Sequence, residues 1–248
     1  MTLAAFFAEM QPMLLGRVSA ADVQRRLGPS PSGTAALQFY AVLVARNVDK
    51  ILREICPTLF VLATRAGVWR DIVDAHVRAH PPAGGDPNRF ADALPELLQE
   101  LARRRADVPP LFAELADYHV VHVRAHHAVD GDDDGFERRL FVRQYAHPVA
   151  EIVDALSRDP NAAVPAPHPA LVVVFRHART LRVRRLVPSA AGLAALARRQ
   201  ALALPPALAS LADLAIVRAE RALVREGVLV PRLSSVPSEK ETPCSDAR

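Results

Sequence analysis

A length of 248 residues, half of them hydrophobic and 23% charged, indicates a globular protein with enough apolar material for two cores. The two cysteines, Cys56 and Cys244, lie too far apart to indicate a disulfide framework or a zinc site, and the apolar residues around Cys56 favour a buried thiol. The N-terminus lacks a basic segment, and no run approaches the roughly 18 apolar residues of a membrane span. We therefore expect a cytoplasmic protein that does not associate with a membrane.

The first part of the chain carries successive helical patterns. Thr2 is positioned to cap the first helix, and Ser19 with Asp22 three residues later has the spacing of a capping box. Pro57 is expected to end or kink a long amphipathic helix, because proline removes a backbone donor and clashes with the preceding turn. The predicted helices cover residues 2–15, a short segment from Ser19, 34–66, 68–79, 88–101 and 111–128, with a turn-rich linker at 28–33. Six helices joined by short loops predict a helical bundle over residues 1–160.

The pattern changes after Pro160. Three prolines within residues 161–169 predict a semi-rigid linker between two domains. The elements predicted next are a β-hairpin of strands 170–175 and 180–187, helices 189–203 and 208–226, and a terminal strand 228–230. This order is typical of a small winged-helix-like domain over residues 170–232, and the polar residues 233–248 predict a disordered tail. The expected fold class is α+β, mainly α: an N-terminal helical bundle plus a C-terminal winged-helix-like domain with a β-hairpin.

Charge is divided in the same way. Residues 168–232 hold eleven arginines and only three acids, a net charge of +8, which leaves −4 for the rest of the chain. The second domain is therefore expected to bind a negative partner.

The arginine-rich hairpin admits three interpretations. Its arginines, beside an unpaired strand edge, can bind an acidic peptide by strand addition. They can instead bind the phosphates of DNA, or they can form the solvated face of a half-buried hairpin. On the first interpretation the peptide-binding residues are Val172, Val174, Arg176, Arg182, Arg184 and Arg185.

Motifs for catalysis are absent from the sequence. It contains no P-loop, no G-x-G-x-x-G, no G-x-S-x-G and no evident carboxylate pair, so we predict no catalytic residue and no cofactor in this chain.

His119, His122 and His126 share one helix face and could bind a metal, but no zinc signature accompanies them, and a partly exposed face is favoured. His76 and His80 have a chelating spacing, although His80 is better explained as the end of a helix before two prolines. The acidic residues 130–135 lack the ligand spacing of a calcium loop and predict a solvated turn.

Several short segments of the N-terminal part resemble one bacterial family. The segments are Tyr40 through Asn47, Cys56-Pro57, His76 through Pro82, Asn88-Arg89-Phe90, PELLQEL at 95–101 and PPLFAELADYH at 109–119. The N-terminal domain of that family carries a DNA-binding label. Its members are accessory partners of multinuclear non-haem iron-dependent oxidases that modify ribosomally made peptides, and the methanobactin biosynthesis accessory subunit is of this type. The resemblance covers roughly residues 3–155.

The resemblance implies a non-catalytic subunit of a heterodimer. The helical module would bind an iron-dependent oxidase, with the iron in that partner, and the second module would bind the leader of a precursor peptide, whose cysteines the partner modifies. The expected interface residues are His80, Asn88, Phe90, Tyr118 and His119, although the family commonly has a glutamate and an aromatic residue in place of the last two.

The alternative function is a DNA-binding transcriptional regulator. The predicted helix 190–203 offers only Arg198, Arg199 and Gln200 as polar side chains, all near its C-terminal end. Recognition helices read bases from their N-terminal part, so DNA is the less favoured partner.

Overall fold

The computed structural model describes residues 2–15, 17–28, 33–81, 86–129, 131, 133–204 and 206–231. In chain order the elements are α1 (Leu3–Leu14), α2 (Ala20–Leu27), α3 (Gly33–Ile55), α4 (Pro57–Arg65), α5 (Trp69–Ala79), η1 (Pro87–Arg89), α6 (Leu94–Arg104), α7 (Leu111–His126), β1 (Leu140–Tyr145), α8 (Val149–Arg158), β2 (Ala170–Arg176), β3 (Val183–Leu186), α9 (Ala190–Arg199), η2 (Pro206–Leu208) and α10 (Asp213–Arg225). The predicted fold class, α+β and mainly α, is confirmed. Residues 29–32 of the predicted linker and the predicted tail 233–248 lie outside the described residues.

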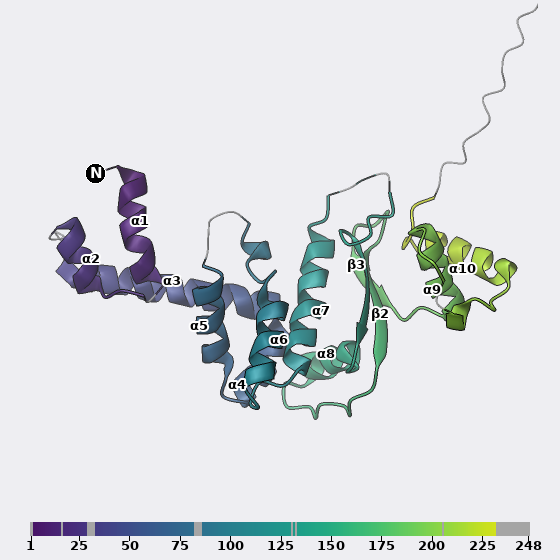
Figure 1. Ribbon diagram of the computed structural model, residues 1–248, viewed down its shortest axis with the longest axis horizontal. Coiled ribbons are helices and arrows are strands. Elements are labelled where there is room, and N and C mark those ends of the chain that lie inside the picture. Colours follow the sequence, from purple (N-terminus) through teal and green to yellow (C-terminus); the bar gives the residue numbers. More distant parts are fainter. Residues whose placement is uncertain are drawn as a thin grey trace, which may run out of the picture.

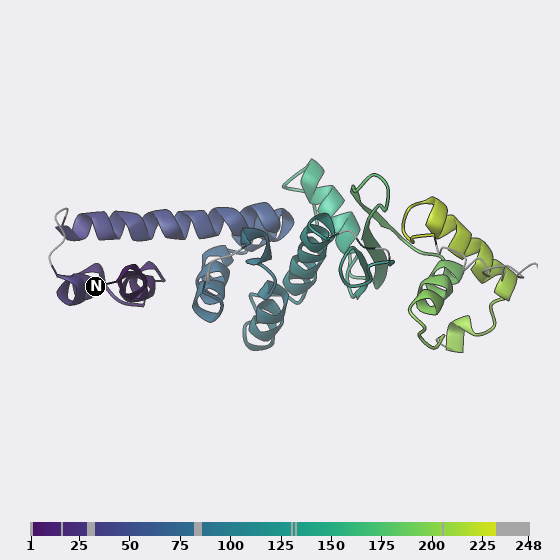
Figure 2. The same ribbon diagram turned by 90° about the horizontal axis from the view of Figure 1, so that it is seen from above.

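Three groups of elements follow one another along the long axis of the molecule (Figures 1 and 2). At one end, α1 and α2 lie beside the N-terminal half of α3. The middle group contains the C-terminal half of α3, the helices α4 to α8 and the sheet. At the other end lie α9 and α10, so the sheet stands between the middle helices and this last pair.

The ends of the first helices follow the sequence signals. The Thr2 hydroxyl accepts a hydrogen bond from the backbone N–H of Ala5. The Ser19 hydroxyl accepts from the N–H of Asp22, and the Asp22 carboxylate accepts from the N–H of Ser19, which completes the predicted capping box. Pro57 is the first residue of α4, where a missing N–H costs no helical hydrogen bond. These predictions are confirmed.

The predicted helix 88–101 is wrong at its N-terminal end. Asp86 caps a short 3-10 turn by accepting a hydrogen bond from the N–H of Asn88 (2.9 Å), and α6 begins only at Leu94. Pro95 is therefore the second residue of α6 and not an interior residue. The position of this proline, which is tolerated in a first turn, decides where the helix begins.

The bundle predicted over residues 1–160 is wrong at its C-terminal end. Residues after α7 form the strand β1 and then the helix α8, neither of which was expected. Leu140 and Phe141 are adjacent and both fully buried, on opposite faces of the sheet. Adjacent apolar residues hide the alternation that identifies a strand buried on one face only.

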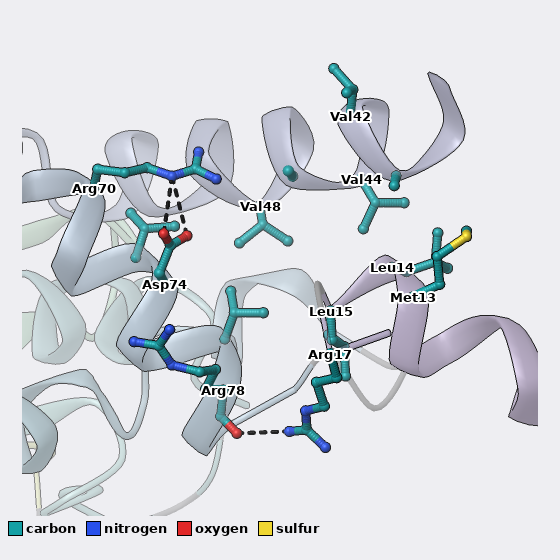
Figure 3. Close-up of a pocket in the computed structure, with 14 residues that line it drawn as sticks. Met13, Leu14, Leu15, Arg17, Val42, Val44, Val48, Arg70, Asp74 and Arg78 are labelled. Atoms are coloured by element: carbon teal, nitrogen blue, oxygen red, sulfur yellow. Dashed lines mark hydrogen bonds and ion pairs between the residues drawn. The ribbon is translucent and has the colours of Figure 1, made fainter. Parts of the chain in front are cut away.

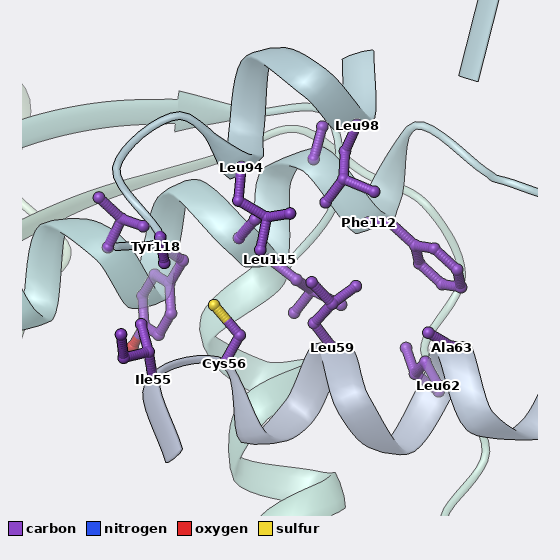
Figure 4. Packing of buried hydrophobic residues seen from close by; sticks show 14 of the residues in the cluster. Ile55, Cys56, Leu59, Leu62, Ala63, Leu94, Leu98, Phe112, Leu115 and Tyr118 are labelled. Atoms are coloured by element: carbon purple, nitrogen blue, oxygen red, sulfur yellow. The ribbon is translucent and has the colours of Figure 1, made fainter. Parts of the chain in front are cut away.

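The central core joins α4, α6 and α7 (Figure 4). Cys56 and Leu59 contribute from α4 and the residue before it, and Leu94, Leu98 and Leu115 pack against them from the other two helices. All five are fully buried. The predicted burial of the Cys56 thiol is confirmed, and this burial raises the pKa of the thiol to about 12.

The sheet has the order β1-β2-β3 and is antiparallel throughout. Val172 and Val174 of β2 belong to the core that contains α7, whereas Val173 and Phe175 belong to a second core that contains α9 and α10. Successive strand residues point to opposite faces, so both faces of β2 are covered. This explains why β2 is a continuous apolar run.

The domain boundary predicted at residues 161–169 is wrong. Strand β1 precedes this proline-containing segment and pairs along its whole length with β2, which follows it. The segment crosses from α8 to β2, and Arg65 of α4 donates a hydrogen bond to the carbonyl of Ala162 within it (3.1 Å). The sheet is therefore one layer shared by two cores.

The predicted terminal strand 228–230 is also wrong. Val228 and Leu229 are fully buried but belong to no strand. Arg139 reaches from the loop before β1 and donates one hydrogen bond to the carbonyl of Val228 (3.0 Å) and one to that of Arg176 (2.8 Å). A side chain thus satisfies a backbone acceptor that a strand partner would otherwise take.

Arg199 at the end of α9 fixes the same segment. Its guanidinium pairs with both carboxylate oxygens of Asp134 (2.8 and 2.9 Å) and with Glu220 of α10 (3.3 Å). Asp134 also accepts from the N–H of Val230 (2.8 Å), and Arg199 donates to the Val230 carbonyl. One buried cation therefore joins α9, α10 and the acidic loop.

Helix α3 carries an exposed apolar stretch. Phe39 is 64% exposed, and Tyr40, Val42 and Leu43 are each more than 40% exposed. Helices α1 and α2 pack on the side of α3 that bears Leu37, which leaves these four residues uncovered by them. Within the described ranges, no helix is long and apolar enough to cross a membrane.

Candidate peptide-binding edge

Strand β3 forms one edge of the sheet. The N–H of His177 donates to the carbonyl of Arg182 (2.9 Å), so the backbone groups of Arg182 and of alternate residues face β2. The backbone N–H and carbonyl groups of Val183 and Arg185 face outward. In the described part of the chain, no other backbone group forms a hydrogen bond with these outward groups. Such an edge can pair with a further strand.

Two exposed arginines stand on this edge. Arg184 lies opposite Phe175 of β2, and Arg182 lies two residues away on the same face of the sheet. Among the described residues, no carboxylate forms an ion pair with either guanidinium. Both are therefore exposed cations beside the outer side of β3, and their contact with a peptide stays a prediction.

Arg185 lies on the opposite face and is held within the molecule. It donates to the hydroxyl of Tyr118 on α7 (2.8 Å) and pairs with Asp154 on α8. The burial of Tyr118 raises the pKa of its hydroxyl, so the phenol stays protonated while it accepts from Arg185. The predicted peptide contact of Arg185 is replaced by a link between β3 and the middle helices.

The remaining predicted peptide contacts are wrong. Val172, Val174 and Arg176 belong to β2, which is the central strand because β1 pairs with its other side. All three are buried, and the N–H of Arg176 donates to the carbonyl of Arg139 (2.7 Å). A peptide can reach none of them without displacing β1 or β3.

Two residues of the predicted partner interface are wrong as well. Tyr118 is 2% exposed and His119 8% exposed, because α7 packs in the middle of the central core. His80 is exposed, whereas Asn88 and Phe90 are half-buried. The side chain of His76 donates to the carbonyl of Phe90 (2.8 Å), which joins α5 to the segment after η1. The accessible part of the predicted interface is therefore this junction.

The histidines of α7 do not gather into a metal site. Burial lowers the pKa of His119 to about 3, so its ring is neutral, and the ring of His122 donates to the carbonyl of Tyr118 (2.7 Å). His126 and His127 lie at the exposed end of the helix, with their rings 4.9 Å apart. Among the described residues, no three His, Cys, Asp or Glu side chains are arranged to hold a metal ion.

The described acids of the segment 130–135 are engaged in ion pairs. Asp133 pairs with Arg138 at 2.5 Å, and Asp134 pairs with Arg199. Asp133 is exposed, but the side chain of Asp134 is only 12% exposed where it pairs with Arg199 of α9, so the predicted solvated turn is only partly correct. Residues 130 and 132 lie outside the described residues.

A pocket of about 420 Å³ lies beside β3 and was not anticipated from the sequence. Among the described residues, Val183 is the only one from the sheet that lines it. The other lining residues come from the end of α3, from η1 and from the last two turns of α7: Ile51, Glu54, Ile55, Pro87, Asn88, His122, Val123, His126 and His127. Three separate helical segments form this wall, so no sequence window contains the pattern.

A second pocket, of about 470 Å³, lies between α1, α3 and α5 (Figure 3). Met13 and Leu14 line it from α1, and Val44 and Val48 from α3. Arg17 donates to the carbonyl of Arg78 at its rim (2.8 Å). The walls are largely apolar, and the rim charges are already paired in part.

No protein-family model matches this chain, and no curated protein matches it.

Proposed function

We propose that this chain is a non-catalytic accessory subunit of a peptide-modifying complex. It binds an iron-dependent oxidase through its helical module and holds the leader of a ribosomally made precursor peptide on the edge of β3. The iron belongs to the partner, and this chain contributes binding alone. Holding the leader raises the effective concentration of the core peptide at the partner's iron site. The resemblance of the sequence points to methanobactin-like or related copper-binding products.

The observation that carries the proposal is the edge of β3. Its outward backbone groups bind no other described backbone group, and the exposed Arg182 and Arg184 stand beside them without an acidic partner in the described residues. Backbone pairing gives affinity for any extended chain, and the two cations select an acidic one.

Docking of the oxidase is assigned to the helical module. The exposed apolar residues of α3 and the junction that contains His80 and Phe90 are the accessible surfaces that fit this role. A contiguous exposed apolar stretch on a helix is typical of a protein interface.

A regulator that reads DNA is the less supported alternative. Arg198 and Arg199 are the only cations on α9. Arg198 pairs with Asp213 (2.6 Å), and Arg199 is buried with Asp134. Arg199 is therefore unavailable to read bases, and Arg198 lies at the C-terminal end of α9, whereas recognition helices read bases from their N-terminal part.

Peptide capture is tested with a fluorescent, extended peptide rich in glutamate and by its anisotropy on the full chain. Binding is expected to weaken as salt rises, because exposed charges attract the peptide. The double variant Arg182→Glu, Arg184→Glu is expected to lose binding. Arg46→Glu makes the same kind of charge change on the exposed face of α3 and serves as the control.

Two outcomes contradict peptide capture. One is equal binding by the wild-type chain and the double variant. The other is tight, sequence-selective binding of duplex DNA that exceeds binding of the peptide.

Association with the oxidase is tested separately. Co-expression with a multinuclear non-haem iron oxidase of the expected class is expected to yield a heterodimer in size-exclusion chromatography. Separate elution of the two proteins contradicts the proposed partner.

A further inference from the structure

The pocket beside β3 and the open edge of β3 share one residue, Val183. Val183 contributes outward backbone groups to the edge and its side chain to the pocket wall. None of the described lining residues belongs to β1 or β2. The pocket therefore lies on the α7 side of the sheet, next to the place where a strand would be added.

The alternation of a strand fixes which side chains of an added peptide meet which surface. Residues directly opposite each other on neighbouring strands point to the same face. Peptide residues opposite Val183 would point toward α7 and the pocket. Their sequence neighbours would point to the other face, where Arg182 and Arg184 stand.

The wall of the pocket contains both apolar and polar residues. Ile51, Ile55 and Val123 line it together with Val183, and Ile55 is among the buried residues of the central core. Glu54 also lines it, and its carboxylate is 3.7 Å from the ammonium of Lys50. A volume of about 420 Å³ lies within the range of pockets that enclose ligand groups.

We infer that this pocket selects one large apolar side chain of a peptide that pairs with β3. The inference rests on the proposed function. The preferred segment is extended and alternates acidic with apolar residues. Its acidic side chains meet Arg182 and Arg184, and one apolar side chain enters the pocket between α3, η1 and α7. The chain would thereby distinguish peptides that alternate acidic with apolar residues from peptides that are acidic alone.

The test uses a displayed library of short peptides in which glutamate alternates with a randomised residue. Peptides retained by the full wild-type chain are expected to be enriched in a large apolar residue at one randomised position. Replacing that residue by alanine is expected to weaken binding by about tenfold to a hundredfold, which corresponds to burial of one such side chain.

The variant Val123→Trp fills the pocket and is expected to abolish the enrichment while peptides are still retained. Val129→Trp is the matched control, because Val129 lies just past the end of α7 and is 82% exposed. Methyl NMR of the wild-type chain supplies a readout that needs no variant. The δ1 methyl signals of Ile51 and Ile55 are expected to shift on binding, and that of Ile72 in the core is expected to stay in place.

The outcomes separate the two proposals. Peptides that depend on Arg182 and Arg184 but show no preference at any randomised position, and leave the Ile51 signal unmoved, overturn the pocket and leave peptide capture intact. If the wild-type chain retains no more peptide than the Arg182→Glu, Arg184→Glu variant, both proposals fail.

Discussion

Arginines of the C-terminal half lie in two different surroundings. The side chain of Arg199 is only 4% exposed and pairs with Asp134 and Glu220. Arg182 and Arg184 are exposed on the edge of β3, and no described carboxylate pairs with them. The first surrounding holds elements together, and the second leaves charge available for a partner.

The contrast shows what separates a structural cation from a binding one. Asp134 belongs to a loop 65 residues before Arg199, and the chain reversal through the sheet brings the two together. A net charge summed over the C-terminal segment counts both kinds of arginine equally. The position of distant carboxylates decides which of them remain available.

The largest effect is expected from Arg199→Met. The substitution leaves Asp134 buried without its cation, and loss of one partner of a buried pair costs about 3–5 kcal/mol of unfolding free energy. Urea denaturation followed by the fluorescence of Trp69, the single tryptophan, measures it. Arg198→Met is the matched control, because its pair with Asp213 is exposed and is worth about 1 kcal/mol or less. Equal costs for the two variants would contradict the structural role of Arg199.

Histidines of α7 repeat the contrast and predict a dependence on pH. Burial lowers the pKa of His119 to about 3 in the folded chain, from an ordinary value of 6.5. Below pH 6.5 the unfolded chain binds a proton that the folded chain does not bind. The free energy of unfolding therefore falls as pH decreases from 6.5 toward 3, by up to about 1.4 kcal/mol per pH unit.

Urea denaturation between pH 7 and pH 4 measures this slope. His119→Phe is expected to reduce the slope, whereas His126→Gln at the exposed end of α7 is expected to keep it. Part of the slope remains in both variants, because burial also lowers the pKa of His76 and of His122. An unchanged slope in His119→Phe would show that His119 is not buried in a neutral form.

A smaller effect is expected from Tyr118→Phe. The substitution removes the hydroxyl that accepts a hydrogen bond from Arg185 and leaves Arg185 with Asp154 alone. The cost is about 1.5–3 kcal/mol, the range of one hydrogen bond to a charged group. Thermal unfolding measures it, and Tyr40→Phe on the exposed face of α3 is the control expected to have no effect.

The smallest effect on stability is expected from Arg182→Glu combined with Arg184→Glu. Neither side chain pairs with a described acid, so the unfolding free energy is expected to stay within about 0.5 kcal/mol of the wild type. The same urea experiment measures it. A loss as large as that of Arg199→Met would place these arginines in the structural group and remove the basis of the candidate edge.

Local signals in the sequence were sufficient for most helices. The capping box of Ser19 and Asp22, the start of α4 at Pro57 and the buried Cys56 each depend on neighbours within a few residues. The hairpin and the helices that follow it were predicted for the same reason. Strand β1 was missed because Leu140 and Phe141 are buried on opposite faces, which gives no alternation to detect.

Local sequence signals predicted only part of the candidate site. The sequence singled out Arg182 and Arg184, which are exposed at this edge, but it assigned Val172, Val174, Arg176 and Arg185 to the same edge. Which strand is central depends on β1, and the pairing of Arg185 depends on Tyr118 and Asp154 from distant helices. Contacts between remote segments leave no local pattern.

The sequence by itself determined where most helices begin, that the fold is mainly helical with a hairpin, and that the positive charge gathers in the C-terminal part. Only the tertiary structure decided that the sheet is one layer shared by two cores, that β3 is its open edge, and that a pocket adjoins Val183. The physical reason is the distance along the chain over which each interaction acts. Caps and periodicity act within one or two turns, whereas strand order and burial depend on which distant surfaces meet.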